Sequence, residues 1–346
     1  MGNLRNAAIL GIGGYVPPRV VRNADLVSVY GIDSDDEWIR QRTGVEERRY
    51  ADDGVGTAEL GAHAARAALQ AAGLEPREID LIVFATLSPD RAFPGCGVDL
   101  QARLGIPDDA AGTFPPCMDI RDQCSGFLYG LSHAVAAIRA GMAERVLLVG
   151  AEVHSAALDL TTRGRTVAAL FGDGAGAVVL GATDADVGVR RVTLGADGRF
   201  ADALKQDVWD MRKRPFIALD DSGNGVIPAR TLWTQMNGQL VYRHAVERMC
   251  RALTELLAAE KCTFDDIDLF VFHQANLRIN HTVQQMLDIP DAKTIHNIQR
   301  YGNTTAATIP LLLDEAVRSG RVGPGSRVAC VAFGSGFTWG ASLIDL

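Results

Sequence analysis

The chain repeats itself, so any fold for it must be built from two related halves. The apolar run IDLIVF at 79–84 recurs as IDLFVF at 267–272, in the second half of the chain. In both halves short runs rich in Val, Ile and Leu alternate with helical stretches, a pattern typical of α/β layering around buried parallel strands. We therefore predict an α/β protein with two halves, residues 1–182 and 183–346.

A second repeated segment relates two polar residues. The sequence predicts one apolar helix from Cys124 to Gly141 and another from Asn303 to Gly320, two spans of equal length that each precede an apolar strand. We expect Cys124 and Asn303 to occupy equivalent helix N-termini. Because duplicated α/β halves usually pack about a pseudo-dyad, both residues are expected to face one shared site.

Composition excludes several classes of protein. The 346 residues include 34 Lys and Arg against 42 Asp and Glu, and the net charge of −8 argues against a general nucleic-acid or anionic-membrane binder. Neither a membrane-spanning apolar run nor a secretory leader is found, so a cytoplasmic protein is expected. The six cysteines form no CxxC pair, which fits neither a zinc site nor a disulfide framework.

Cys124 is the cysteine whose context favours chemistry. It follows the expected strand 118–120 and precedes a helix that opens Ser125-Gly126-Phe127. Free N–H groups and the helix dipole at such a position are expected to lower the thiol pKa and favour the thiolate. Small buried residues are the simpler interpretation of four other cysteines, which are Cys96, Cys250, Cys262 and Cys330.

His273 and Asn303 complete a possible constellation with Cys124. His273 ends an apolar strand, where a histidine is more often structural, and Asn303 could merely cap a helix. Together, however, Cys, His and Asn can activate an acyl acceptor and donate two hydrogen bonds to a developing oxyanion or enolate. We find no such constellation around the remaining histidines, which are His63, His133, His154, His244, His281 and His296.

Three other segments are candidates for a functional role. Two of them have both a structural and a functional interpretation, and for the third the sequence argues against a phosphate-binding loop. The glycine-rich stretch 334–340 can form an oxyanion hole with its amides, a turn between two strands, or both. In 172–177 the glycines precede a strand rather than the helix that a phosphate-binding loop requires, so a tight turn is expected. The polar segment 197–235 lies outside the repeat and is either a solvated loop or a pocket wall.

Four motifs together carry a resemblance to a known family. They are CSGF at 124–127, HQANLR at 273–278, YGNT at 301–304 and FGSGFTWG at 333–340. In this order they resemble β-ketoacyl-acyl-carrier-protein synthase III of the thiolase superfamily, and the match extends from residues 36–44 to the last strand.

The resemblance implies a five-layered αβαβα homodimer that needs no metal or cofactor. Cys124 would take an acyl group from acyl-coenzyme A, and His273 and Asn303 would assist decarboxylation of a malonyl thioester on acyl carrier protein. Backbone amides of Cys124 and Ser335 would form the oxyanion hole. Phe93 would cross the dimer interface to close the partner's acyl pocket.

The resemblance also implies a set of residues that bind coenzyme A or the carrier protein. In the family, positions matching Trp38 and one of the two arginines 163 and 165 hold the adenine, Asn276 lies along the pantetheine tunnel, and Arg278 docks the carrier. The complete predicted set is Trp38, Arg42, Arg163, Arg165, Asn276 and Arg278.

Two departures from the family pattern keep a second function open. Arg121, Asp122 and Gln123 precede the cysteine where fatty-acid initiators carry small residues, and the stretch 163–166 stands two residues farther from 172–174. Both resemble synthase-III-like enzymes of specialised metabolism, of quinolone, pyrone or polyketide type. We therefore expect acetyl-coenzyme A to be a poor starter.

Three further function classes fit the sequence less well. A papain-like hydrolase would carry a different local signature around its cysteine and has no duplicated halves. A degradative thiolase would place a second cysteine in the C-terminal glycine-rich loop, where Ser335 stands. A non-catalytic scaffold on the same fold would be expected to lack a member of the Cys, His and Asn set.

Overall fold

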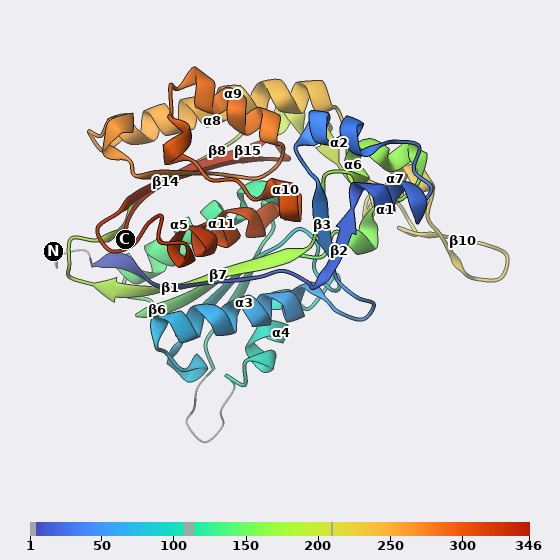
Figure 1. Ribbon diagram of the computed structural model, residues 1–346. Helices are drawn as coiled ribbons and strands as arrows, with labels where there is room; N and C mark the ends of the chain where they lie inside the picture. The colour runs from blue at the N-terminus through green and yellow to red at the C-terminus, as the bar shows by residue number, and fades with distance from the viewer. Residues whose placement is uncertain (1–4, 107–111, 113, 209) are drawn as a thin grey trace.

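The computed structural model describes residues 5–106, 112, 114–208 and 210–346. Its elements stack in five layers, with helices outside, between and outside two sheets (Figure 1). This is the αβαβα arrangement that the resemblance implies, and the predicted fold class is confirmed. Within the described residues, no helix has both the length and the apolar character needed to cross a membrane.

The first sheet lies in the N-terminal half and has the strand order β1-β7-β6-β4-β5. Strand β7 pairs antiparallel with both β1 and β6, whereas β4 is parallel to β6 and β5. The strands are β1 (Asn6–Tyr15), β4 (Leu81–Ala85), β5 (Cys117–Ile120), β6 (Arg145–Glu152) and β7 (Gly174–Thr183).

The second sheet has the strand order β8-β15-β14-β13, which corresponds to β1-β7-β6-β4 of the first sheet. Its strands are β8 (Gly188–Ala196), β13 (Leu269–Phe272), β14 (Arg327–Gly334) and β15 (Thr338–Asp345). A single parallel bridge from Phe270 to Thr294 takes the place of β5. The first sheet ends at Thr183 of β7 and the second begins at Gly188 of β8. The predicted division after residue 182 stays a prediction.

Apolar helix faces fill the spaces between the layers. Helices α5 (Gly126–Arg139) and α11 (Thr308–Arg318) lie between the sheets, while α3 (Thr57–Ala72) and α4 (Cys96–Arg103) cover the first sheet. Helices α8 (Gly238–Ala259) and α9 (Leu277–Met286) cover the second. Glycine lets α3 approach closely, because a Cβ on Gly13 of β1 would lie 2.3 Å from the Ala68 nitrogen.

The remaining elements surround one end of the sheets. They are β2 (Arg19–Arg22), α1 (Asn23–Ser28), α2 (Asp36–Thr43), β3 (Glu47–Tyr50), α6 (Arg165–Ala168), β9 (Leu204–Lys205), β10 (Ala218–Leu219), β11 (Gly225–Val226), α7 (Ala229–Leu232), β12 (Gln235–Met236) and α10 (Ile298–Tyr301). Single 3₁₀ turns cover Pro76–Glu78, Gln123–Ser125, Ser155–Ala157, Thr162–Gly164, Gly198–Phe200, Phe264–Asp266, Asp291–Lys293 and Thr305–Ala307.

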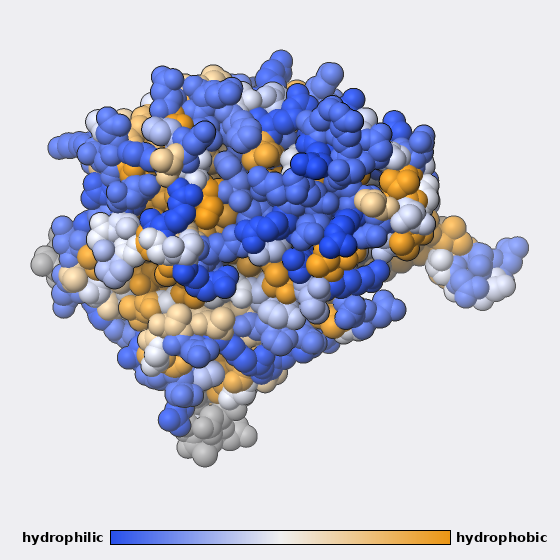
Figure 2. All heavy atoms as spheres, viewed as in Figure 1, coloured by the Kyte–Doolittle hydropathy of each residue, from blue (hydrophilic) through white to orange (hydrophobic). Residues whose placement is uncertain are grey.

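The segment 197–235 divides into a docked part and a projecting part. Strand β9 pairs with β12 on the body of the protein, whereas the β10–β11 hairpin extends away from it (Figure 1). Apolar side chains show as orange near the base of this projection (Figure 2), and Met211, Phe216, Leu219 and Val226 are exposed.

The structure corrects the predicted equivalence of Cys124 and Asn303. Gln123 and Thr305, which have φ of 44° and 50°, each begin a 3₁₀ turn that leads into the central helix of its half. When the halves are aligned on these turns, Gln123 corresponds to Thr305, so Ala306 is the counterpart of Cys124. Matching the helix ends instead gives the predicted pairing, which fails at the helix starts because α5 has 14 residues and α11 has 11.

Candidate active site

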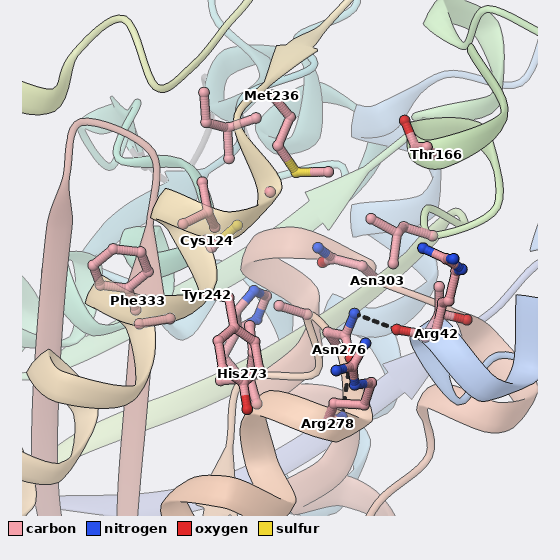
Figure 3. Close-up of a pocket in the computed structure, with 18 of the residues that line it drawn as sticks. Arg42, Cys124, Thr166, Met236, Tyr242, His273, Asn276, Arg278, Asn303 and Phe333 are labelled. Atoms are coloured by element: carbon pink, nitrogen blue, oxygen red, sulfur yellow. Dashed lines mark hydrogen bonds between the residues drawn. The ribbon is translucent and has the colours of Figure 1, made fainter. Parts of the chain in front are cut away.

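A cavity of about 530 Å³ brings together Cys124, His273 and Asn303 (Figure 3). Cys124 comes from the turn before α5, His273 follows β13, and Asn303 follows α10. The rest of the lining is Trp38, Arg42, Thr43, Thr166, Leu170, Phe171, Leu204, Met236, Gly238, Gln239, Val241, Tyr242, Ala245, Met249, Ala275, Asn276, Arg278, Ile279, Phe333 and Gly334.

His273 is held with one ring nitrogen available to the cavity. Its backbone N–H donates to the Val331 carbonyl at 2.8 Å, and its Nδ1 lies 2.7 Å from Thr308 Oγ1. Because that hydroxyl donates its hydrogen to the Thr305 carbonyl at 3.0 Å, Nδ1 must be the donor and Nε2 carries the lone pair. Nε2 is buried without a protein partner, and burial lowers the imidazole pKa to about 3.

Asn303 is oriented by the turn that follows it. Its backbone N–H donates to the Leu170 carbonyl at 2.8 Å, which fixes the residue beside Phe171. Its side-chain oxygen accepts from the Thr305 N–H at 2.8 Å. The amide nitrogen is therefore left as a donor toward Cys124 and His273 (Figure 3).

Cys124 does not have the lowered pKa that its helix N-terminus predicts. The residue is 7% exposed, and burial raises the thiol pKa to about 12. Hydrogen bonds from the side chains of Asn303 and Thr305 act in the opposite direction but are outweighed. Removal of the thiolate from water thus outweighs these hydrogen bonds, and the thiol needs a proton acceptor at the moment of reaction.

The C-terminal glycine-rich segment closes onto the cysteine. A Cβ built on Gly334 would lie 3.1 Å from both the Cβ and the backbone nitrogen of Cys124. Next to it, Ser335 donates from its side chain to the Leu204 carbonyl, which ties this segment to β9. The role of the Cys124 and Ser335 amides as an oxyanion hole stays a prediction.

Most of the predicted coenzyme A and carrier set also lies on this cavity. Trp38, Arg42, Asn276 and Arg278 all line it. Asn276 caps α9, since its side-chain oxygen accepts from the Arg278 N–H at 2.9 Å, and its amide nitrogen donates to the Arg42 carbonyl at 2.9 Å. These contacts hold α2 and α9 together at the cavity.

The two candidate arginines are placed differently. The Arg165 guanidinium carbon is 5.3 Å from the centroid of the Trp38 ring, and that of Arg42 is 4.6 Å from it. Arg163 instead forms an ion pair with Asp159, with 2.6 Å between Nε and Oδ2. Arg165 is therefore the arginine that joins the Trp38 cluster.

Several residues singled out in the sequence are not brought to the cavity. Among the described residues that line it, Phe93, Asp122 and Gln123 do not occur. Phe93 is 84% exposed, and Gln123 bonds back to the Arg121 carbonyl instead. The positive φ of Gln123 turns the chain at this point. The expectation of a poor acetyl starter, which these residues suggested, stays a prediction.

Sequence reasoning missed two polar residues that contact the site from behind. Thr305 is fully buried, and its hydroxyl lies 2.5 Å from Nε2 of His154, which is 7% exposed. Thr305 stands two residues from Asn303, a proximity that could have drawn attention to it. His154 carries no such signal because it comes from the far end of β6.

No metal centre is apparent in the part of the chain that the structure describes. Groups of three or more His, Cys, Asp or Glu side chains suited to a metal ion are not found among those residues. The predicted site residues are a thiol, an imidazole, amides and guanidinium groups, which suit acyl transfer and anion binding.

Comparison with protein families matches two segments of the chain. Residues 118–198 match the 3-oxoacyl-[acyl-carrier-protein] synthase III family, and residues 257–346 match its C-terminal domain. The β-ketoacyl-[acyl-carrier-protein] synthase III of Rhizorhabdus wittichii is 42% identical over 343 residues, 99% of each chain. That of Geobacillus kaustophilus is 40% identical over 335 residues, 97% of each chain.

Solved structures give the same result in three dimensions. The synthase III of Thermus thermophilus superposes with a TM-score of 0.86 at 37% identity, covering 98% of this chain and 99% of its own. The priming β-ketosynthase of the R1128 polyketide biosynthetic pathway gives a TM-score of 0.87 at 33% identity, covering 99% of this chain and 97% of its own.

Proposed function

The chain belongs to the 3-oxoacyl-[acyl-carrier-protein] synthase III family, and on that premise we propose that it condenses an acyl-coenzyme A starter with malonyl-acyl carrier protein to begin fatty-acid synthesis. The single observation that carries the proposal is that one cavity holds Cys124, His273 and Asn303 at its wall and Trp38 and Arg278 along its lining. Full-length identity of about 40% to named synthases supports the same reaction.

In the first half of the reaction Cys124 accepts the acyl group. Its S–H bond breaks as the proton moves to the lone pair of His273 Nε2, and sulfur attacks the thioester carbonyl. The carbon–sulfur bond to coenzyme A then breaks, and the released thiolate takes a proton from solvent. Because burial lowers the pKa of His273 to about 3, the imidazolium is favoured only while an anion shares the cavity.

In the second half the malonyl thioester loses carbon dioxide. The amide nitrogen of Asn303 and the proton now on His273 Nε2 donate to the thioester oxygen as the enolate forms. The enolate carbon attacks the acyl group on Cys124, and the sulfur leaves and recovers its proton from His273. One solvent proton is consumed overall, by the departing coenzyme A.

A second function, which differs in the acyl starter and in the pathway, is also supported. The R1128 priming β-ketosynthase superposes as well as the fatty-acid enzymes do, so a synthase-III-like enzyme of specialised metabolism with a non-acetyl starter is the alternative. The same three residues would do the same chemistry, and only the acyl group would differ.

Intact mass of the protein after incubation with a panel of acyl-coenzyme A thioesters tests the proposal. We expect one acyl adduct, mapped by digestion to the peptide that contains Cys124, and its loss in Cys124→Ala. Cys117→Ala is the matched control, because Cys117 lies on the preceding strand and should leave the adduct unchanged. An adduct on another cysteine, or none with any donor, would overturn the assignment.

A further inference from the structure

The back of the active-site cysteine is formed by two buried polar residues that the reaction above does not use. The 3₁₀ turns 123–125 and 305–307 pack against each other. The Thr305 side chain lies within hydrogen-bonding reach of the Cys124 thiol. His154, immediately beyond β6, lies on the far side of Thr305 with its Nε2 2.5 Å from the hydroxyl oxygen.

The His154 ring is fixed in place from three sides. Its backbone N–H donates to Asp173 Oδ1 at 2.7 Å, its ring packs at 4.7 Å on Phe171, and Nε2 contacts Thr305. Burial lowers the imidazole pKa to about 3, so the ring is neutral and carries one N–H. A freely rotating core histidine would not present one nitrogen to a hydroxyl in this way.

The direction of the hydrogen bonds follows from the thiolate. A sulfur anion accepts hydrogen bonds, so the Thr305 hydroxyl must donate to Cys124, and this bond favours the thiolate. With its hydrogen given to sulfur, the Thr305 oxygen accepts from His154, whose proton must then be on Nε2. Each donor in the series strengthens the next.

The backbone of Thr305 gives independent support. Its φ of 50° lies in the left-handed region, where a β-branched residue is rare and glycine would be unstrained. Uncommon backbone geometry of this kind concentrates at functional sites. At this position the N–H orients Asn303, and the hydroxyl lies between Cys124 and His154.

We propose that Thr305 and His154 form a donor chain, from His154 Nε2–H to Thr305 Oγ1–H to Cys124 Sγ, that stabilises the thiolate during acyl transfer. The inference rests on the proposed role of Cys124 as nucleophile. No proton passes along the chain: the S–H proton still goes to His273, and both donors keep theirs. Thr305 and His154 are therefore positioning residues.

Other charged groups around Cys124 must be kept constant in any test. The titratable residues that surround the thiol are His273, His154 and Glu152 of β6, whose buried carboxyl opposes the thiolate. Hydrogen bonds from Thr86 and Ser88 hold Glu152 in place, and none of the variants below removes them.

The test is the pH profile of Cys124 alkylation by iodoacetamide, followed by intact mass in the full-length protein. We expect Thr305→Ala to shift the profile to higher pH and to slow alkylation at pH 8 by about 10-fold, since a hydrogen bond to the charged sulfur is lost. His154→Leu should shift the profile in the same direction and slow alkylation by about threefold to fivefold, since its hydrogen bond is to the neutral Thr305 oxygen. Thr305→Ser keeps the hydroxyl and His154→Gln keeps an N–H donor, so both should stay within about threefold of the wild type.

A second measurement separates a positioning role from general damage. Once Cys124 is acylated its sulfur carries no charge, so single-turnover release of carbon dioxide from pre-acylated enzyme should change less than twofold in Thr305→Ala. Coincident alkylation profiles of wild type, Thr305→Ala and His154→Leu would overturn the proposal, as would equal losses in both half-reactions. Should Thr305→Ala not fold, the pair His154→Leu and His154→Gln decides alone.

Failure of the proposed function would be visible separately. Alkylation reports on the thiol without any acyl substrate. A protein that shows the expected shifts but accepts no acyl group from coenzyme A would contradict the proposed reaction and leave the donor chain standing.

Discussion

The guanidinium group of Arg165 lies over the indole ring of Trp38, 5.3 Å from its centroid. The same guanidinium donates to the Asp33 carbonyl at 2.9 Å, which holds it beside Trp38. Arg163, only two residues earlier, is occupied by Asp159. This difference gives a test of which arginine meets coenzyme A.

We predict that Arg165→Ala raises KM for acyl-coenzyme A by about 10-fold with little change in kcat, because it removes the cation beside Trp38 that we expect to contact coenzyme A, and a tenfold change in affinity is about 1.4 kcal/mol. Arg163→Ala is the matched control and should change KM by less than threefold, since the Arg163 side chain is paired with Asp159. Steady-state kinetics with varied acyl-coenzyme A would show the reverse order if Arg163 were the ligand.

We predict that Asn303→Ala slows release of carbon dioxide by about 10²-fold or more and slows acylation of Cys124 far less. The Asn303 amide is the donor that the enolate requires, whereas His273→Ala should impair both steps because His273 also accepts the thiol proton. Single-turnover acylation and decarboxylation measure the two steps separately. Equal losses in both steps for Asn303→Ala would contradict this assignment.

We predict a homodimer in which Phe93 closes the acyl pocket of the partner subunit. The Phe93 side chain is 84% exposed on the single chain, so it is accessible to a second copy. Phe93→Ala should widen the range of starters without abolishing turnover, whereas Met142→Ala, at an equally exposed apolar residue of 80%, should not. A monomer by light scattering that retains full activity would remove the argument.

We predict that acetyl-coenzyme A is a poorer donor than a medium-chain, β-keto or aromatic thioester. The prediction rests on Arg121, Asp122 and Gln123, which precede Cys124 where fatty-acid initiators carry small residues. Apolar pockets discriminate by only about 10- to 200-fold per methylene, so kcat/KM must be compared across chain lengths. If acetyl is the best donor, the protein is an ordinary initiating synthase.

We predict that stability falls as the pH drops below about 6.5. Burial holds the pKa of His273 at about 3, so between pH 3 and 6.5 the unfolded chain binds a proton there that the folded chain does not. His273→Gln should therefore reduce the slope of unfolding free energy against pH by up to about 1.4 kcal/mol per pH unit between pH 4.5 and 6.

Denaturant unfolding at several pH values measures that slope. Glu152 has the opposite effect, since burial raises its pKa to about 7 and the folded state then holds the extra proton. Because Glu152 is present in both proteins, its contribution cancels in the comparison. Identical slopes for wild type and His273→Gln would contradict the prediction.

The sequence allowed the layered fold to be predicted because the repeat and the alternation of strands and helices are properties of continuous segments. It also indicated that Cys124, His273 and Asn303 would meet. The sequence did not allow the two halves to be aligned correctly around Cys124 and Asn303, because α11 is shorter than α5. The correct alignment follows from the left-handed residues Gln123 and Thr305, which begin equivalent turns.

What lay beyond the sequence depended on burial and on contacts between distant segments. The pKa of Cys124 is raised chiefly by burial, and the position of the residue before a helix in the sequence does not indicate how deeply it is buried. His154 reaches the site only because β6 and the turn at Thr305 come together in space. The choice between Arg163 and Arg165 likewise required knowing that Asp159 binds the first.

The projecting β10–β11 hairpin can change in length or sequence without disturbing the active site. Its paired residues are exposed and contribute nothing to the apolar clusters between the layers. Insertions or deletions there can alter the outer contour of the molecule while the spacing between Cys124 and His273 is preserved. Relatives can therefore acquire new surface contacts at this hairpin without reinventing their chemistry, and it offers a place to attach a probe that leaves the catalytic geometry intact.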